Sequence, residues 1–348
     1  MRTRTLRSGD RALEVSALCF GIMNLGVDVD KDDSYALLDR YFEAGGRFFD
    51  TAANYGAWTE ESLGTRAGDS ERLLGSWLAD RGVAGEVVVA TKCGAGKREA
   101  GRPLAGEGPT NFEGLDAAVV RRELAGSLER LGLERVGVYY GHVDDRRLGA
   151  TEIADTFSAL VDEGLVAIPG LSNTATWRLA IAREHSRSTG GAPFGAWQQE
   201  HSIYWPRPGL PTTTLVDTEA IDYAADQPDL TVLTYSPNQR GQLVRPWMSV
   251  RPPYDHPGSL ERLRRVHEIA HELGATAGQI ALAWHLAGPT SRMQRPAGSD
   301  VSALDALPAR RVAMIPVVGA RTLAQLEESL GALDVTLSEA HRAVLDGV

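Results

Sequence analysis

Short apolar segments alternate with longer amphipathic segments along the chain, and this alternation limits the possible folds more than any other feature of the sequence. Segments of four to seven residues that are rich in β-branched and aromatic side chains predict strands. The predicted strands are residues 15–21, 47–51, 87–92, 136–140, 167–171, 196–199, 231–235 and 312–317. Elsewhere apolar residues recur at spacings of three and four, which predicts helices. The predicted helices are residues 32–44, 70–81, 119–131, 152–163, 174–189, 218–225, 260–273 and 322–333.

Eight strands that alternate with helices predict parallel βαβ units, because strands joined through a helix run in the same direction. Eight such units close into a (β/α)8 TIM barrel, so we expect residues 1–348 to form a single barrel domain. An open doubly wound sheet is the alternative. That fold calls for a Gly-x-Gly-x-x-Gly turn after the first strand, whereas residues 21–26 read GIMNLG and lack the middle glycine.

Charge and composition restrict the partners of the chain. The 348 residues carry a formal net charge of −10, which repels the phosphates of nucleic acids and anionic membranes. No apolar stretch approaches the roughly 18 residues of a transmembrane helix. The two cysteines, Cys19 and Cys93, are too few for a disulfide framework or a zinc knuckle. Charged residues interrupt the early apolar run, so we expect a first strand there and not a signal peptide, in a cytoplasmic protein.

Polar residues interrupt the apolar strands at their carboxyl ends. Asp50 ends the second strand, Lys92 ends the third, and His142 follows the fourth. Polar residues also follow the fifth, sixth and seventh strands. The carboxyl ends of barrel strands meet at one face, which carries the active site in essentially every barrel enzyme. The pattern therefore predicts a functional site at this face.

The residue types at these strand ends suit the reduction of a carbonyl group. Lys92 is one of three lysines, against 33 arginines, and a lysine ammonium is a compact charge. It could lower the pKa of a nearby tyrosine, and Asp50 could hold it charged and oriented. Tyr55 would then be a general acid for the carbonyl oxygen, with His142 hydrogen-bonded to the phenol or to the substrate. Each residue alone has an ordinary structural explanation, but the combination indicates catalysis.

Several longer motifs resemble those of the aldo-keto reductase superfamily, in the same order, over about residues 10–340. They are FDTAANYG at 49–56, GDSERLLG at 68–75, ATKCG at 90–94, SLERLG at 127–132, GLSN at 170–173, TYSP at 234–237 and VVGARTLAQLEESLGAL at 317–333. The resemblance implies a barrel enzyme that reduces an aldehyde or ketone with NADPH. It also implies a catalytic tetrad with a tyrosine as general acid. The tetrad residues would be Asp50, Tyr55, Lys92 and His142.

The resemblance further implies how NADPH or NADP+ would lie, extended across the mouth of the barrel. Ser172, Asn173 and Gln198 would hold the carboxamide of the nicotinamide. The ring of Tyr235 would stack on the nicotinamide. The other implied cofactor-binding residues are Gly21, Met23, Ser236, Asn238, Gly319, Arg321 and Gln325.

Arg321 bears on the choice between NADPH and NADH. It lies near the start of the last predicted helix, and a cation beside a helix N-terminus is a good site for a phosphate. By resemblance it would bind the 2′-phosphate, which favours NADPH. Gln325 matches an adenosine contact of the family, but the asparagine usual four residues later is Ser329 here.

Two long connections stand apart from this pattern. The loop at 57–67 leaves the strand that supplies Tyr55 and carries Trp58, and Trp205 lies in another strand-to-helix loop. These aromatic side chains suggest a pocket for a substrate with an apolar or ring face. Residues 289–311 connect a helix to the last strand, so we expect them at the face opposite the chemistry. The expected partner is a small-molecule carbonyl substrate, with no nucleic acid and no membrane, and a monomer is favoured.

Two other functions are alternatives. Residues 267–271 read HEIAH, a literal H-E-x-x-H motif. His267 and His271 could bind zinc, and Glu268 could act as the base of a metallopeptidase. The third histidine of the extended motif is replaced by Ala277, so no metal site is predicted. The second alternative is a barrel that binds NADPH without turnover as a regulatory or redox-sensing protein, although it would not need the full tetrad.

Overall fold

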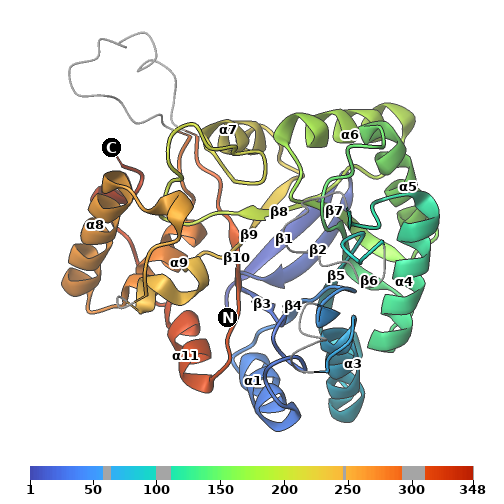
Figure 1. Ribbon diagram of the computed structural model, residues 1–348, viewed down its shortest axis with the longest axis horizontal. Helices are drawn as coiled ribbons and strands as arrows, with labels where there is room; N and C mark the ends of the chain where they lie inside the picture. The colour runs from blue at the N-terminus through green and yellow to red at the C-terminus, as the bar shows by residue number, and fades with distance from the viewer. Residues whose placement is uncertain (58–63, 99–110, 246–247, 292–309, 348) are drawn as a thin grey trace.

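A closed barrel of eight parallel strands lies at the centre of the computed structural model (Figure 1). The structure describes residues 1–57, 64–98, 111–245, 248–291 and 310–347. Around the barrel the strands follow the order β10-β3-β4-β5-β6-β7-β8-β9, and every neighbouring pair is parallel. The barrel strands are β3 (Cys19–Gly21), β4 (Phe48–Asp50), β5 (Val88–Cys93), β6 (Val136–Gly141), β7 (Val166–Ser172), β8 (Ala196–Glu200), β9 (Thr231–Tyr235) and β10 (Ile315–Val318). The predicted (β/α)8 TIM barrel is confirmed.

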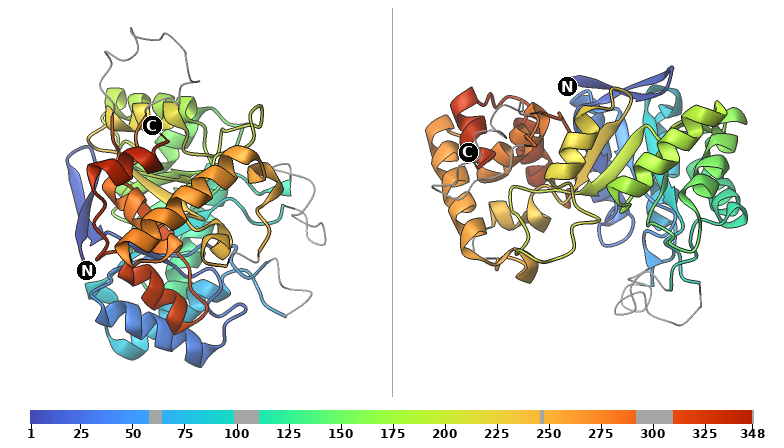
Figure 2. Two further views of the ribbon diagram at one scale, coloured as in Figure 1. Left: turned by 90° about the vertical axis from the view of Figure 1, so that its left-hand side faces the viewer. Right: turned by 90° about the horizontal axis from the view of Figure 1, so that it is seen from above.

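Helices surround the barrel and form most of the connections between its strands (Figures 1 and 2). They are α1 (Lys31–Glu43), α3 (Asp69–Arg81), α4 (Ala117–Leu131), α5 (Ala150–Asp162), α6 (Thr176–Thr189), α7 (Thr218–Ala225), α8 (Pro257–Leu273), α9 (Ala277–Ala287), α11 (Leu323–Gly331) and α12 (Glu339–Leu345). Local sequence sets their ends. In α4, for example, the Asp116 side chain accepts a hydrogen bond from the backbone of Ala118, and Gly132 ends the helix at a φ of 66°.

An antiparallel hairpin precedes the barrel and corrects one prediction. Strands β1 (Thr3–Ser8) and β2 (Arg11–Ser16) pair with each other, and the barrel begins only at β3. The predicted strand at 15–21 is therefore wrong, because the buried run crosses from the end of the hairpin into the barrel. The Ser8 hydroxyl donates to the carbonyl of Pro193, just before β8, at 2.5 Å. The hairpin thus lies at the amino ends of the strands, at one end of the barrel (Figure 2).

A second correction concerns the segment between β9 and β10. The predicted helix at 260–273 exists as α8, but it packs on α9 and α12. Helix α9, which packs on β10, was not predicted. Its sequence AGQIALAWHLA is apolar on nearly every side and nearly all of it is buried, so it carries no amphipathic pattern. Thr276 and Gln279 form a capping box at its start, which is the local signal that the apolar spacing lacked.

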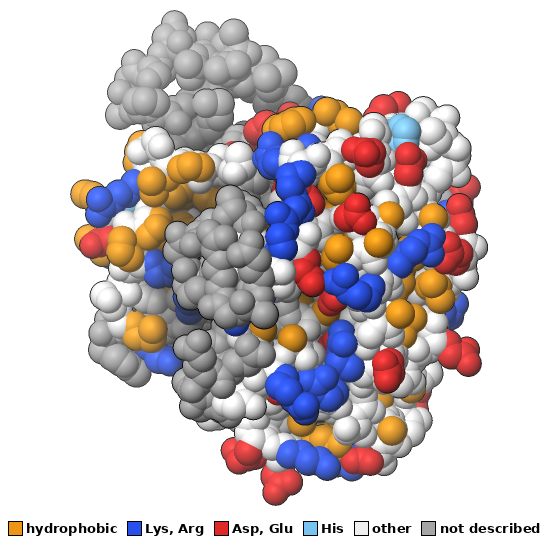
Figure 3. Space-filling model, turned by 45° about the vertical axis from the view of Figure 1, so that its right-hand side comes forward, with side chains coloured by type: hydrophobic (Ala, Val, Ile, Leu, Met, Phe, Trp, Pro, Cys, Tyr) orange, Lys and Arg blue, Asp and Glu red, His pale blue; other side chains and the backbone are white. Residues whose placement is uncertain are grey.

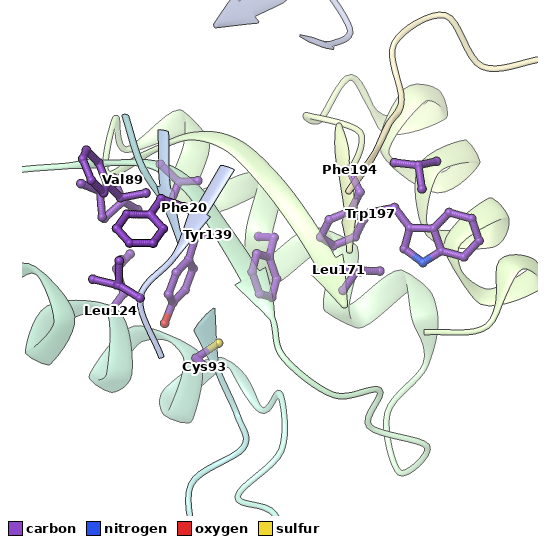
Figure 4. Close-up of a cluster of buried hydrophobic side chains, with 14 of the residues drawn as sticks. Phe20, Val89, Cys93, Leu124, Tyr139, Leu171, Phe194 and Trp197 are labelled. Carbon is purple, nitrogen blue, oxygen red and sulfur yellow. The ribbon is translucent and has the colours of Figure 1, made fainter. Parts of the chain in front are cut away.

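The main core fills the layer between the strands and the helices. Figure 4 shows Phe20, Val89 and Tyr139 of the strands packed toward Leu124 of α4. The Tyr139 hydroxyl donates to the carbonyl of Val120 at 3.0 Å, so its one polar group is satisfied inside this layer. A smaller apolar cluster fills the inside of the barrel below the carboxyl ends of the strands. The rim therefore stands on a packed core.

The surface carries charges of both signs. Figure 3 shows arginine and lysine side chains interspersed with aspartate and glutamate over the face that it presents. Among the described residues, no helix has both the length and the apolar character needed to cross a bilayer.

Two buried histidines join the barrel to α9. His201, which follows β8, and His285 of α9 are hydrogen-bonded ring to ring at 3.0 Å. The Nδ1 atom of His285 also lies 2.7 Å from the carbonyl of Ala281. Burial lowers the pKa of His285 to about 4, and burial together with His285 and Arg262 lowers the pKa of His201 well below its usual value. Both rings are therefore neutral near pH 7.

We predict that this pair makes the fold sensitive to acid. An unfolded histidine takes up a proton as the pH falls through about 6.5, whereas folded His285 stays neutral down to about 4. The free energy of unfolding should therefore fall by about 2 kcal/mol from His285 between pH 7 and 4.5. Urea denaturation at the two pH values should show a smaller fall in His285→Gln than in the wild type. Exposed His267→Gln is the control, and an equally steep fall in His285→Gln would contradict the prediction.

Candidate active site

Four of the predicted site residues meet at the carboxyl end of the barrel. The Lys92 ammonium donates hydrogen bonds to Oδ1 of Asp50 and to the carbonyl of Thr51. The Tyr55 hydroxyl lies 3.1 Å from the same ammonium nitrogen. The rings of Tyr55 and His142 meet edge to face, with centroids 5.8 Å apart. The structure thus brings together all four residues that the sequence analysis placed in a tetrad.

The strand register explains why the two charged members face each other. In β4, Phe48 points into the barrel, and Asp50 two residues later points the same way. In β5, inward-facing Ala90 is likewise followed by Lys92. Because β4 and β5 are paired neighbours, the two inward charges come into contact at the top of the barrel. Their side chains are 2% and 0% exposed, so the pair is shielded from water.

Gln198 contacts this pair from the other side of the barrel. Its amide nitrogen donates to Oδ2 of Asp50 at 2.8 Å, while Oδ1 of Asp50 accepts from Lys92. Both carboxylate oxygens are therefore hydrogen-bonded, as a buried carboxylate requires. Gln198 was predicted only to contact the carboxamide of the cofactor. The structure adds a role in holding Asp50 that no spacing along the chain could indicate.

Burial controls the protonation of the cluster. Burial raises the pKa of Tyr55 above its usual value; Lys92 acts in the opposite direction but does not outweigh burial. Lys92 lowers the pKa of Tyr55 as expected, but the effect only partly offsets that of burial, and the net shift is upward. Burial lowers the pKa of His142 well below its usual value, and Lys92 adds to this effect. Near pH 7, Tyr55 is accordingly a neutral phenol and His142 a neutral imidazole.

A second group of predicted residues extends from this cluster toward β7 and β9. The side-chain amide of Asn173 donates to the carbonyl of His142 at 2.9 Å and lies 3.1 Å from the Ser172 hydroxyl. The Tyr235 hydroxyl donates to the amide oxygen of Asn173 at 2.6 Å. Through its side chain, Asn173 thereby links the loops after β6 and β7 to the end of β9 around the mouth of the barrel.

Backbone strain concentrates in these same loops. In the described part of the chain, four residues other than glycine have a left-handed φ, and all lie just after β7 or β9. They are Asn173, Ser236, Gln239 and Arg240, with φ between 48° and 57°. Such conformations cost free energy and persist where the surroundings enforce them, typically at ligand sites. Two of the four, Asn173 and Ser236, were predicted to bind a cofactor.

The remaining predicted cofactor residues lie at the ends of β3 and β10. Gly21 is the last residue of β3. A Cβ atom added at Gly319 would lie 3.5 Å from the carbonyl oxygen of Gly21, so the loops after β3 and β10 are in contact. Met23 is exposed in the loop after β3. The backbone N–H of Arg321 donates to the side chain of Gln325 at 2.8 Å. These residues therefore form one edge of the mouth.

A groove of about 730 Å³ begins beside this edge. Gln325 and Glu328 of α11 line one side, and the other sides come from the start of α9, from α8 and from the loop after β9. Thr276 before α9 donates to the Glu328 carboxylate at 2.7 Å, which joins two sides of the groove. The groove is large enough for a ring system the size of a nucleoside.

Of the two predicted pocket tryptophans, only Trp205 can be placed, and it does not reach the cluster. Trp58 lies outside the described residues, as do 58–63 of the long 57–67 loop. The indole of Trp205 packs against the guanidinium of Arg262, 5.5 Å from it, and the carbonyl of Trp205 lies 2.8 Å from a ring nitrogen of His256. Trp205 thus belongs to the contact between its loop and α8. Most of the 289–311 connection is likewise outside the described residues.

A polar cluster beside Tyr235 was missed. Glu200, the last residue of β8, accepts hydrogen bonds from Arg251 at 2.6 Å and from Tyr254 at 2.9 Å. Burial raises the pKa of Tyr235, and Glu200 adds to this effect. A polar residue at a strand end was the available signal for Glu200, but Arg251 and Tyr254 lie in a loop without regular spacing.

The H-E-x-x-H motif lies on the surface of α8, away from the barrel mouth. His267 and His271 are exposed on α8, which packs on the outer side of α9. The Glu268 carboxylate is ion-paired with Arg264 of the same helix. Among the described residues, no group of three or more His, Cys, Asp or Glu is arranged to hold a metal ion.

Comparison with known proteins agrees with the fold and the motifs. A model of the Aldo/keto reductase family matches residues 17–348. The uncharacterised oxidoreductase YrpG of Bacillus subtilis is 30% identical over 342 residues, which are 95% of this chain and 91% of that protein. Norsolorinic acid reductase stcV of Emericella nidulans is 27% identical, over 94% of this chain and 76% of its own length. The thermostable aldo-keto reductase Tm1743, solved with the inhibitor epalrestat, has a TM-score of 0.70 at 21% identity, over 100% of this chain and 99% of that one.

The family model covers nearly the whole chain, and the fold is a closed (β/α)8 barrel. The protein is therefore an oxidoreductase of the aldo-keto reductase type. The chain belongs to the aldo/keto reductase family. The resemblance drawn from the motifs is confirmed. Nicotinamide dinucleotides are the cofactors typical of this family.

We predict that Asp50 and Lys92 are strongly coupled in stability. Lys92→Met leaves the Asp50 carboxylate buried without its counter-charge, so the free energy of unfolding should fall by about 3–5 kcal/mol. In the double variant Asp50→Asn with Lys92→Met the loss should be smaller than the sum of the two single losses. Urea denaturation followed by circular dichroism measures both. Lys31→Met, on the exposed start of α1, is the control, and additive single losses would count against the coupling.

Proposed function

We propose that this protein reduces an aldehyde or ketone with NADPH, with Tyr55 as the general acid. The observation that carries the proposal is the position of the Lys92 ammonium between the Asp50 carboxylate and the Tyr55 hydroxyl. A buried ammonium in this place has a catalytic use, because it stabilises the phenolate that remains after a tyrosine gives up its proton.

The residues around the mouth fit an extended dinucleotide. In the described part of the chain, the buried Oδ1 of Asn238 and the buried Nδ1 of His142 have no hydrogen-bond partner within the protein. Polar atoms in this condition favour a bound polar molecule. The strained backbone after β7 and β9 supports the same interpretation. Ser172, Asn173 and Tyr235 would hold the nicotinamide end.

The other end of the mouth fits the adenosine. The groove beside Gln325 would accept the base and its ribose. The backbone of Arg321 contacts Gln325 at the edge of this groove, and its side chain, which is 57% exposed, would bind a 2′-phosphate. Gly21, Met23, Ser236, Asn238 and Gly319 would lie along the dinucleotide between the two ends.

The chemistry then follows from the protonation states of the cluster. A bound reduced nicotinamide supplies a hydride to the carbonyl carbon. Tyr55, kept protonated near pH 7 by burial, gives its proton to the carbonyl oxygen. Lys92 stabilises the phenolate from 3.1 Å, and Asp50 keeps Lys92 in place. His142 stays neutral and can hydrogen-bond the substrate oxygen without adding a charge.

Binding of NADPH without turnover is the competing function. It requires the cofactor residues but not the contact between Tyr55 and Lys92. Burying the Lys92 ammonium beside Tyr55 costs free energy. A protein that only binds the dinucleotide would not need this contact. The presence of the contact supports the reductase.

We predict that Tyr55→Phe separates these two functions. Loss of the acid should lower kcat at least about 100-fold, while NADPH affinity should stay within about twofold, because the hydroxyl serves the chemical step. Steady-state assays at the NADPH absorbance measure kcat, and quenching of the seven tryptophans measures affinity. Tyr35→Phe, whose hydroxyl contacts Asp80 on the surface, is the control. Near-normal kcat in Tyr55→Phe, with chemistry rate-limiting, would remove the assigned role.

The substrate panel should begin with aromatic carbonyl compounds. Relatives of the chain include norsolorinic acid reductases and an aryl-alcohol dehydrogenase of Pestalotiopsis microspora, which is 28% identical over 55% of this chain and 48% of its own length. The panel should extend to sugar and aliphatic aldehydes. Turnover with any member, lost in Tyr55→Phe, supports the proposed function.

A further inference from the structure

Arg321, the expected 2′-phosphate ligand, already has an anionic partner. Its guanidinium lies 2.6 Å from the Asp28 carboxylate and 3.4 Å from the side-chain oxygen of Asn24. Arg321 follows β10 and Asp28 follows β3, and these strands are neighbours in the barrel. The ion pair therefore spans the edge of the mouth between the two loops.

The loop that carries Asp28 is held in a fixed shape. The carbonyl of Asn24 accepts hydrogen bonds from the backbone N–H groups of Val27, Asp28 and Val29, at 3.0 to 3.1 Å. Val27 and Val29 are buried on either side of Asp28. The conformation of this loop therefore fixes the position of the Asp28 carboxylate beside Arg321.

The two helices behind these loops are fixed to each other as well. Figure 1 shows α11 beside α1, and Arg40 of α1 is ion-paired with Glu327 of α11 through a contact of 3.0 Å. Further carboxylates follow Asp28 closely along the chain. They are Asp30, Asp32 and Asp33, at the start of α1. The surroundings of Arg321 on the α1 side are therefore acidic.

We propose that Asp28 is a specificity-determining residue that competes with the 2′-phosphate of NADPH for Arg321 and so lets the enzyme also use NADH. The inference rests on the proposed function, because it takes Arg321 as the 2′-phosphate ligand. The 2′-phosphate of NADPH is an anion, and it must either displace Asp28 from Arg321 or share the guanidinium with it. In either case the protein binds NADPH less tightly relative to NADH.

NADH meets the same pair differently. Its ribose carries a 2′-hydroxyl, which can donate a hydrogen bond to a carboxylate, as acidic residues do in other dinucleotide sites. Asp28 can therefore accept from NADH without losing Arg321. Arg321 favours NADPH and Asp28 favours NADH, so the balance between the two cofactors is set by this one ion pair.

The test is a fluorescence titration of the full-length protein with NADPH and, separately, with NADH. Asp28→Asn should raise the ratio of NADH to NADPH dissociation constants about five- to tenfold, through tighter NADPH binding. Asp32→Asn removes the same charge from the exposed start of α1 and should change the ratio less than about twofold. The effect of Asp28→Asn should shrink as salt is raised, since the groups involved are exposed charges.

A second pair of variants tests the route through Arg321. Arg321→Ala should weaken NADPH more than NADH, and in that background Asp28→Asn should lose most of its effect on the ratio. An effect of full size without Arg321 would overturn the competition. A ratio that moves no further in Asp28→Asn than in Asp32→Asn would overturn it as well.

The proposed function fails in a different way. If the wild type binds neither nucleotide, or if Arg321→Ala leaves NADPH binding unchanged, the assignment of the 2′-phosphate site falls, and this inference falls with it. If both nucleotides bind and Arg321→Ala discriminates against NADPH, the behaviour of Asp28→Asn decides this inference alone.

Discussion

The ion pair between Asp50 and Lys92 is the interaction on which the rest of the site depends. Two charges removed from water cost several kcal/mol unless each is paired and hydrogen-bonded. Here the carboxylate uses one oxygen for Lys92 and the other for Gln198, and the ammonium has Thr51 and Tyr55 as further neighbours. The closed barrel makes this possible, because it brings residues of β4, β5 and β8 to one point above a packed interior.

The loops around that pair carry the strain that the core can support. Asn173 and Ser236 have left-handed backbones directly after β7 and β9. The Asn173 side chain is hydrogen-bonded to His142 and to Tyr235, and Ser236 follows Tyr235 in the chain. These conformations cost free energy, and they persist because the apolar layers behind the strands hold the strand ends in place. In this fold the wall of the barrel usually carries stability and the carboxyl ends of the strands carry the active site.

Much of this could be predicted from the chain, and the failures have physical causes. The alternation of strands and helices predicted the barrel, and the strand ends together with the family motifs predicted the four residues that meet at its mouth. The first strand was misplaced because Val15 to Gly21 is apolar across two elements. Helix α9 was missed because burial on nearly every side removes the periodicity that marks a helix.

The sequence by itself determined the fold class, the family and the identity of the four residues at the barrel mouth, because each depends on local periodicity or on a contiguous motif. Only the tertiary structure decided which atoms those residues touch. Gln198 holds Asp50 across 148 residues of chain, and Arg321 meets the Asn24–Asp28 loop across 297. Closure of the barrel joins its first and last strands, and no pattern along the chain records a contact between segments that meet only when the barrel closes.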